Sequence, residues 1–377
     1  MARASAIQGS TKQFAKLQHQ TPLHDAACFG NVKRALEALK EPGIDVNDPS
    51  LASLTPLHIA AMYGHVKVVD LLLKHNDIQV NLGRGADGAT SLLLAAQNGH
   101  EKVVELMLTK EDIEVNRATE VGATPLFVAA MHGHARVVAL LLNKEDTLVN
   151  PTMGSATTPL YVAAQNGHFQ VVELLLKHAD IALNYQDDDG STPLHVAANN
   201  GHYWVVRMLL MREGIQINLS DLSGATPLLL AAGMGYDRVV ELLLRQADIL
   251  VNETMLDGCT PLIWAARLGH HHVAAELLQH PDIDVNRDWN DGSTALLHAA
   301  EKGHDTIVRL LLEKDGIQAN RATVVGETPL SLAAEQKHGK IVEMLLRKEE
   351  VRAIGWNGWR PQRRARVPRR SRLAMQC

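Results

Sequence analysis

Apolar residues recur along the chain at spacings that predict pairs of short helices. In the segment 192–218, the apolar residues of "VVRMLL" at 205–210 lie at i, i+1, i+4 and i+5, which is one face of a helix. Thr192 followed by Pro193 is typical of a helix start, because the hydroxyl accepts an unpaired backbone N–H and proline fits the first helical position. Gly201 predicts the end of this first helix. The segment therefore predicts two helices joined by a glycine turn.

The same pattern returns ten times at a nearly constant spacing. It begins at Thr21, Thr55, Thr90, Thr124, Thr158, Thr192, Thr226, Thr260, Thr294 and Thr328. The intervals are 34 residues, with one of 35. A catalytic residue is needed once, whereas the Thr, His and Asn residues of this pattern recur at one phase, so we interpret them as parts of a repeat unit. A glycine shortly before each Thr predicts a turn that projects between successive helix pairs.

The opening motif of each unit carries a family resemblance. Seven copies read "TPLHDAA", "TPLHIAA", "TPLFVAA", "TPLYVAA", "TPLHVAA", "TPLLLAA" and "TPLIWAA", and together with the two-helix pattern they resemble the ankyrin repeat. Ser91 and Ala295 replace the proline in two further copies, and the tenth reads "TPLSLAA". The resemblance implies an all-α solenoid of helix-turn-helix units with projecting β-turn or hairpin loops. We expect a head at 1–20, ten repeats at 21–351 and a tail at 352–377.

Composition adds information about the core and the compartment. Hydrophobic residues make up 46% of the 377 residues and aromatic residues 4%, so the expected core is aliphatic. The three cysteines, Cys28, Cys259 and Cys377, are odd in number and far apart, which does not suit a disulfide framework and favours a reducing compartment. Neither a secretory signal nor a run long enough for a membrane span is visible. We therefore expect a cytoplasmic protein that does not contact a membrane.

The net charge of -5 divides into two unequal parts. Residues 352–377 contain eight Arg and no acidic residue, which leaves 29 basic against 42 acidic side chains in residues 1–351, a balance of -13. We expect this basic, proline-interrupted tail to be disordered. It allows a nuclear location, through an import receptor or nucleic acid, although it is equally compatible with a solvated extension of no function.

Nineteen histidines raise the question of metal binding or pH sensing. Eight follow the turn glycine position, namely His65, His100, His134, His168, His202, His270, His304 and His338. Adjacent repeats would hold them roughly 10 Å apart, too far to share an ion, so a structural role is expected. The triplet at 270–272 is the one local candidate for adventitious metal binding. The resemblance implies that His24, His58 and His195 bond the capping Thr, and we expect neither a metal nor a cofactor.

Two further patterns recur in or interrupt the repeats. The segment "GRGADGAT" at 83–90 lacks the lysine and the flanking elements of a phosphate-binding loop, so we interpret it as a lengthened repeat turn. An asparagine at a fixed offset, at Asn47, Asn81, Asn116, Asn150, Asn184, Asn218, Asn252, Asn286 and Asn320, is expected to stabilise the turn backbone through its side chain. In ankyrin proteins of animal cells this position resembles the acceptor of an asparaginyl hydroxylase.

No unrepeated polar cluster is left to form an active site, so we expect a non-enzymatic protein-interaction scaffold rather than an enzyme. The resemblance places partner recognition on the concave face, where first helices and turns meet. We place the turn tip three residues after each asparagine. The candidate partner-binding residues are Met153, Asp187, Asp221, Met255 and Trp289 at or near the tips, Tyr185 beside them, and Met131, Met234 and Leu268 on the facing helices.

The mixture of apolar and acidic side chains at these positions predicts the chemical character of the partner. Methionine and tryptophan suit a protein surface, and the acidic body favours a basic, partly apolar segment. We expect a monomer that binds such a protein and that does not bind nucleic acid, except through its tail. Two alternatives remain open, a regulatory protein whose Arg-rich tail engages nucleic acid or an import receptor, and a translocated effector that mimics host scaffolds.

Overall fold

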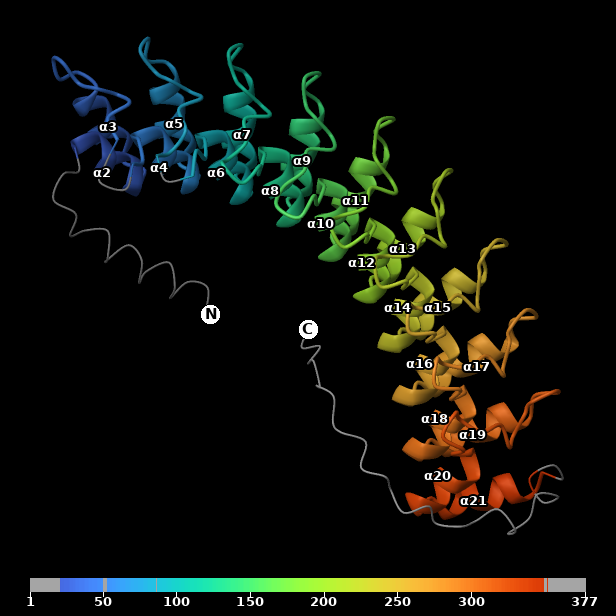
Figure 1. Cartoon of the computed structure of the whole chain (residues 1–377). Coiled ribbons are helices and arrows are strands. Elements are labelled where there is room, and N and C mark those ends of the chain that lie inside the picture. The colour runs from blue at the N-terminus through green and yellow to red at the C-terminus, as the bar shows by residue number, and fades with distance from the viewer. Residues whose placement is uncertain (1–20, 50–52, 86, 349–350, 352–377) are drawn as a thin grey trace. The chain divides into compact units, whose positions relative to one another are not determined.

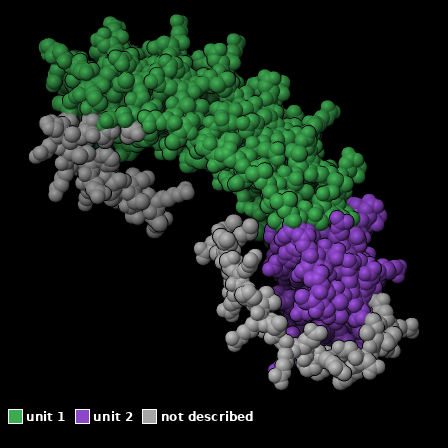
Figure 2. All heavy atoms as spheres, in the orientation of Figure 1, with its two compact units in different colours: residues 1–256 green, residues 257–377 purple. Residues whose placement is uncertain are grey.

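The computed structural model describes residues 21–49, 53–85, 87–348 and 351, and it consists of paired helices joined by turns (Figure 1). The described residues form ten helix pairs and contain no extended strand. The predicted head at 1–20 and tail at 352–377 lie outside the described residues. The chain divides into two compact units, residues 1–256 and 257–377 (Figure 2).

The described residues of unit 1 form seven helix pairs. Their bounds are α2 Pro22–Phe29, α3 Val32–Ala38, α4 Pro56–Met62, α5 Val66–Leu73, α6 Ser91–Gln97, α7 Glu101–Leu108, α8 Pro125–Met131, α9 Ala135–Leu142, α10 Pro159–Gln165, α11 Phe169–Leu176, α12 Pro193–Asn199, α13 Tyr203–Leu210, α14 Pro227–Met234 and α15 Asp237–Leu244. Each first helix packs against the first helix of the next pair, and each second helix against the next second helix. Within this unit the even-numbered helices follow the inner side of a curved row and the odd-numbered helices its outer side (Figure 1).

In the part of unit 2 that the structure describes, three helix pairs are built in the same way. Their bounds are α16 Pro261–Leu268, α17 His271–Gln279, α18 Ala295–Lys302, α19 Asp305–Leu312, α20 Pro329–Glu335 and α21 Gly339–Leu346. Here too α16, α18 and α20 pack in one row and α17, α19 and α21 in another.

Local sequence explains where each helix begins and ends. The capping Thr of every pair accepts the N–H of the residue three positions later, as Thr192 does from His195 at 3.4 Å. The first helices end at a left-handed residue, such as Gly30 at φ +65° or Gly303 at φ +81°. In the last pair this left-handed position is held by Lys337, at φ +64°.

The core is aliphatic, as its composition predicts. The paired alanines of the first helices, such as Ala197 and Ala198, are fully buried, which lets neighbouring helices approach closely. The second helices bury a valine pair and a leucine against them, as Val205, Val206 and Leu209 do in α13. No helix within the described residues has the length and hydropathy of a membrane-spanning segment.

Candidate protein-binding surface

Buried histidines fix the start of several first helices. In α4 the N–H of Thr55 donates to His58 Nδ1 at 3.2 Å, while the Thr55 hydroxyl lies 2.9 Å from the same nitrogen. His195 of α12 repeats the arrangement and its Nε2 lies 3.1 Å from the Ala225 carbonyl of the next pair. Burial lowers the pKa of His58 to about 4 and also lowers that of His195. The expected bond to the capping Thr is present, and the ring of His195 also ties one repeat to the next.

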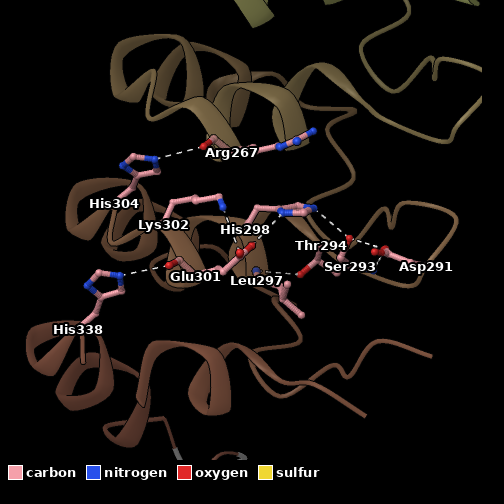
Figure 3. Close-up of polar contacts among 10 residues, drawn as sticks. All are labelled: Arg267, Asp291, Ser293, Thr294, Leu297, His298, Glu301, Lys302, His304 and His338. Carbon is pink, nitrogen blue, oxygen red and sulfur yellow. Dashed lines mark hydrogen bonds and ion pairs between the residues drawn. The ribbon is translucent and has the colours of Figure 1, made fainter. Parts of the chain in front are cut away.

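The histidines after the turn glycines are structural bridges between repeats. In unit 1, His100 Nε2 lies 2.9 Å from the Met62 carbonyl, and in unit 2, His338 Nε2 lies 3.2 Å from the Glu301 carbonyl (Figure 3). The same contact is made by His65, His134, His168, His202 and His304. The glycine of the preceding repeat is part of this joint, because a Cβ on Gly64 would lie 2.6 Å from His100 Nδ1. Among the described residues, no group of three His, Cys, Asp or Glu side chains could hold a metal ion.

The asparagines also bridge repeats. Asn47 Nδ2 donates to the Asp77 carbonyl at 2.7 Å, and its Oδ1 accepts the N–H of Gln79 at 2.9 Å. The same pair of bonds is made by Asn81, Asn116, Asn150, Asn184, Asn218 and Asn286. The predicted side-chain bonds to backbone are confirmed, with the difference that the bonded backbone belongs to the loop of the following repeat.

The projecting turns place several candidates differently from the expectation. Met153, Asp187, Asp221 and Trp289 are not tip residues, because each donates its N–H to the carbonyl four residues later and so closes the base of its turn. The tip is formed by the next two residues. Each tip also bonds the preceding turn, as Leu222 N–H does to the Asp189 carbonyl at 2.9 Å. The position three residues after the asparagine is the first residue of the turn and not its tip.

The acidic candidates organise their own turns. Asp187 Oδ1 accepts the N–H groups of Asp189 and Ser191 at 3.1 and 2.8 Å, and its Oδ2 accepts the Tyr161 hydroxyl at 2.6 Å. The burial of Tyr161, together with this contact, raises the pKa of the tyrosine. Asp221 Oδ1 accepts the N–H groups of Ser223 and Ala225 in the same way. The carboxylates left exposed at this part of unit 1 are those of Asp188 and Asp189.

The remaining unit 1 candidates lie on first helices and beside turns. Met131 and Met234 end α8 and α14, where Met131 is half-buried and Met234 is exposed. Tyr185 follows its asparagine and is exposed. Met153 and Met255 are half-buried at the base of their turns.

The sequence analysis did not identify the exposed apolar side chains of the turns. Leu222 and Leu256 are 71% and 79% exposed on successive turns of unit 1, and Val121 is exposed on an earlier turn. Val324 and Val325 hold the corresponding tip of unit 2. Moving the tip position by one residue along the sequence identifies Leu222, Leu256 and Val324, and moving it by two identifies Val121 and Val325. Successive exposed apolar tips are typical of a protein-binding surface.

In unit 2, Trp289 belongs to an aromatic and polar cluster. Its ring lies 5.2 Å from the His298 ring and 5.1 Å from the Arg267 guanidinium. Burial lowers the pKa of His298, and Figure 3 shows this side chain directed toward Ser293 and Asp291. Leu268, the last residue of α16, is half-exposed. Trp289 therefore has internal contacts on two sides and is half-buried rather than fully exposed.

Ser293, His298 and Asp291 meet in that cluster without forming a hydrolase triad. Ser293 Oγ lies 2.9 Å from His298 Nε2 and donates to Asp291 Oδ1 at 2.5 Å. In a triad the carboxylate holds the histidine and the hydroxyl is open to substrate, whereas here the hydroxyl bridges the two and Ser293 is buried. The arrangement stabilises the turn.

A comparison with protein families places this architecture among known ones. A family model described as ankyrin repeats (three copies) matches residues 5–83, 23–119, 77–153, 126–221, 211–288 and 281–354. A comparison with curated proteins gave no match to this chain. Ankyrin repeats are, in general, protein–protein interaction modules. The matched residues extend over most of the sequence and the helix pairs have the expected form, so the chain belongs to the ankyrin repeat family.

Proposed function

We propose that this protein is a non-enzymatic scaffold that binds a partner protein through its first helices and projecting turns. The recurring Thr, His, Asn and Gly residues are used for contacts within the array, as Thr55, His100 and Asn47 illustrate. Recognition then falls to the positions that differ between repeats. The observation that carries the proposal is the exposure of Leu222, Leu256 and Met234 at such positions.

In unit 1 the binding surface combines apolar and acidic side chains. Met131, Tyr185 and Met234 supply contact area. Met153 lies beside Gly122 of the turn that carries Val121, and Met255 directly precedes the exposed Leu256. Asp187 and Asp221 shape these turns, and Asp188 and Asp189 offer exposed negative charge. This mixture suits a basic, partly apolar segment of a partner, bound by a monomeric scaffold.

In unit 2, Leu268 and Trp289 form the corresponding surface of that unit. Arg267 lies over the Trp289 ring, so the tryptophan is held in one orientation before a partner arrives. An anchor that is already ordered loses less conformational entropy on binding.

The test begins with a partner isolated by affinity capture with the full chain and identified by mass spectrometry. Dissociation constants are then measured for purified partner with Trp289→Ala and Met234→Ala. Each should weaken binding by about 2 kcal/mol or more if the side chain is an anchor. Asp188→Asn should chiefly slow association and weaken its salt dependence, because a rim charge acts on the encounter rate.

Thermal unfolding of each variant separates binding from packing. Lys67→Ala on α5 is the matched control for surface truncation, since Lys67 lies on a second helix in unit 1. If Trp289→Ala and Met234→Ala lower the melting temperature and leave affinity untouched, both residues are structural and the proposed surface is wrong.

A further inference from the structure

Helix α13 differs from the other second helices at positions that face outward. Trp204 is its second residue and is 56% exposed, and Met211 directly follows the helix and is 75% exposed. The residues equivalent to Trp204 are polar in every other pair, namely Lys33, Lys67, Lys102, Arg136, Gln170, Arg238, His272, Thr306 and Lys340. Those equivalent to Met211 are polar as well, for example Lys74 and Lys177. Repeat architecture therefore does not require these apolar side chains.

The same face of α13 also differs in charge from several other second helices. Arg207 stands where five other second helices carry an acid, at Asp70, Glu105, Glu173, Glu241 and Glu343. Trp204, Arg207 and Met211 are spaced i, i+3 and i+7, so they share one face of the helix.

Neighbouring helices extend this face into a patch. The Arg207 guanidinium lies 5.4 Å from the Trp204 ring centroid, and the Tyr203 ring meets Trp204 edge to face at 5.1 Å. Arg238 of α15 lies 4.4 Å over the Tyr203 ring. Phe169 begins α11 at the position that Tyr203 holds in α13, and it is 47% exposed. We call Phe169, Tyr203, Trp204, Arg207, Met211 and Arg238 the α13 patch.

The patch is positively charged on an acidic body. Within the described part of the chain, neither Arg207 nor Arg238 makes an ion pair. Of the acids on the flanking helices α11 and α15, Glu173 pairs with Lys177 and Glu241 pairs with Arg245, while Asp237 Oδ1 accepts the backbone N–H of Arg238. Two arginines stacked on aromatic rings are thus left to meet a carboxylate from outside the chain.

We propose that the α13 patch binds an acidic amphipathic segment of a second protein. The apolar side of that segment packs on Trp204, Phe169 and Met211, and its carboxylates pair with Arg207 and Arg238. The proposal goes beyond the function above, because the odd-numbered helices of unit 1 lie on the side opposite to the first helices (Figure 1). A scaffold with two faces of opposite charge preference joins a basic partner to an acidic one.

Charge favours a peptide over a lipid surface. A flat anionic membrane would meet the acidic side chains around the patch as well, such as Glu213 and Asp237, and the balance of -13 in residues 1–351 would oppose its approach. A single extended or helical segment touches the patch alone.

The experiment uses the full chain and a displayed library of random 16-residue peptides, with bound peptides read by sequencing. Trp204→Lys and Arg207→Glu restore the residues that other second helices carry at these positions, so both should fold. Lys102→Ala on α7 is the control at the position equivalent to Trp204, and Met234→Ala controls for the first-helix surface. The most enriched peptide is synthesised, labelled and titrated by fluorescence anisotropy, and sedimentation with phosphatidylserine vesicles forms a separate arm.

The proposal predicts selected peptides with an excess of Asp and Glu over Lys and Arg. Their affinity should fall at least tenfold in Trp204→Lys and in Arg207→Glu and stay unchanged in Lys102→Ala and Met234→Ala. Selected peptides without an acidic excess, or equal affinity for the Trp204→Lys variant, overturn it. Vesicle binding that requires Trp204, in the absence of such peptides, replaces the acidic segment with a lipid surface.

Discussion

At the scale of single residues, buried histidines make the folded chain sensitive to acid. The pKa of His58 is lowered from 6.5 to about 4 by burial, so the unfolded chain takes up a proton before the folded chain does. Stability is therefore complete above about pH 6.5 and decreases as the pH falls toward 4. The loss from this one group approaches about 3 kcal/mol.

Urea unfolding between pH 7 and pH 4 measures this loss. His58→Leu places the residue that other first helices carry, as at Leu93 and Leu229, and should reduce the difference in unfolding free energy between the two pH values by about 2 to 3 kcal/mol. An unchanged pH dependence in His58→Leu would show that carboxylates alone cause the acid loss.

Lys337 is a second residue whose energetic cost can be measured. It occupies the left-handed region at φ +64°, where the equivalent residues of the other repeats are glycines. Left-handed backbone costs a residue with a side chain about 1 to 2 kcal/mol, partly offset by the greater freedom of glycine in the unfolded chain. Lys337→Gly should therefore stabilise the protein by about 1 kcal/mol in thermal or denaturant unfolding.

The neighbour of Lys337 supplies the control. Gln336 lies in the right-handed helical region at φ -80°, where glycine brings no relief of strain. Gln336→Gly should destabilise by a few tenths to about 1 kcal/mol. If Lys337→Gly and Gln336→Gly change the unfolding free energy in the same direction, relief of backbone strain does not explain the effect of Lys337→Gly.

At the scale of elements, the helix pairs follow from local signals in the sequence. Thr–Pro starts, glycine ends and apolar spacing act within a few residues, so the helices could be placed before the structure was known. The turns could be recognised but their tips were placed one residue early. The orientation of the Asp187 carboxylate depends on the N–H groups that it accepts, such as that of Ser191. No pattern in the sequence indicates that orientation.

The candidate binding surface was harder to predict, because its side-chain contacts also have no local signal in the sequence. Trp289 looked like a free anchor because its contacts, Arg267 and His298, come from other elements. The exposed Leu222 and Leu256 could be predicted from the repeat pattern. The bond from Tyr161 to Asp187 could not, because it joins α10 to a turn 26 residues later in the sequence.

The joint between helix pairs makes a prediction about Gly201. This glycine is left-handed at φ +71°, and a Cβ would lie 2.6 Å from Tyr236 Cε1 of the next repeat. Gly201→Val therefore adds a clash between repeats to the backbone strain. We expect a loss of several kcal/mol and faster amide exchange in α12 to α15 than in α4 to α7.

Gly214 separates the two effects of that substitution. It is also left-handed, at φ +81°, but a Cβ there meets no atom within 4 Å. Gly214→Val should cost the backbone strain alone, about 1 to 2 kcal/mol. Equal losses in the two variants would mean that the contact with Tyr236 does not couple the repeats.

At the scale of the whole molecule, the repetition of one joint decides how the chain unfolds. Neighbouring helix pairs of unit 1 contact each other through the same elements: a row of first helices, a row of second helices, an asparagine bridge and the side chain after the turn glycine. That side chain is a histidine such as His100, except at Tyr236. Among the described helices of this unit, the extensive packing joins helices of one pair or of neighbouring pairs. Stability then approximates a sum of repeat and nearest-neighbour contributions.

Removing N-terminal pairs one at a time tests that sum. Chains that begin at Thr55, Thr90 and Thr124 lack one, two and three pairs, and each step should lower the unfolding free energy and the denaturant m-value by a similar increment, because each removes one interface of the same kind. Deletion of residues 352–377 is the control for chain length, since it removes no described helix pair. Equal stability in all three truncated chains, with each shown to be monomeric, would mean that the repeats are not coupled as nearest neighbours. A complete loss of folding at the first step would mean instead that α2 and α3 act as an indispensable cap, which a polar end repeat can do by covering the apolar face of the next pair.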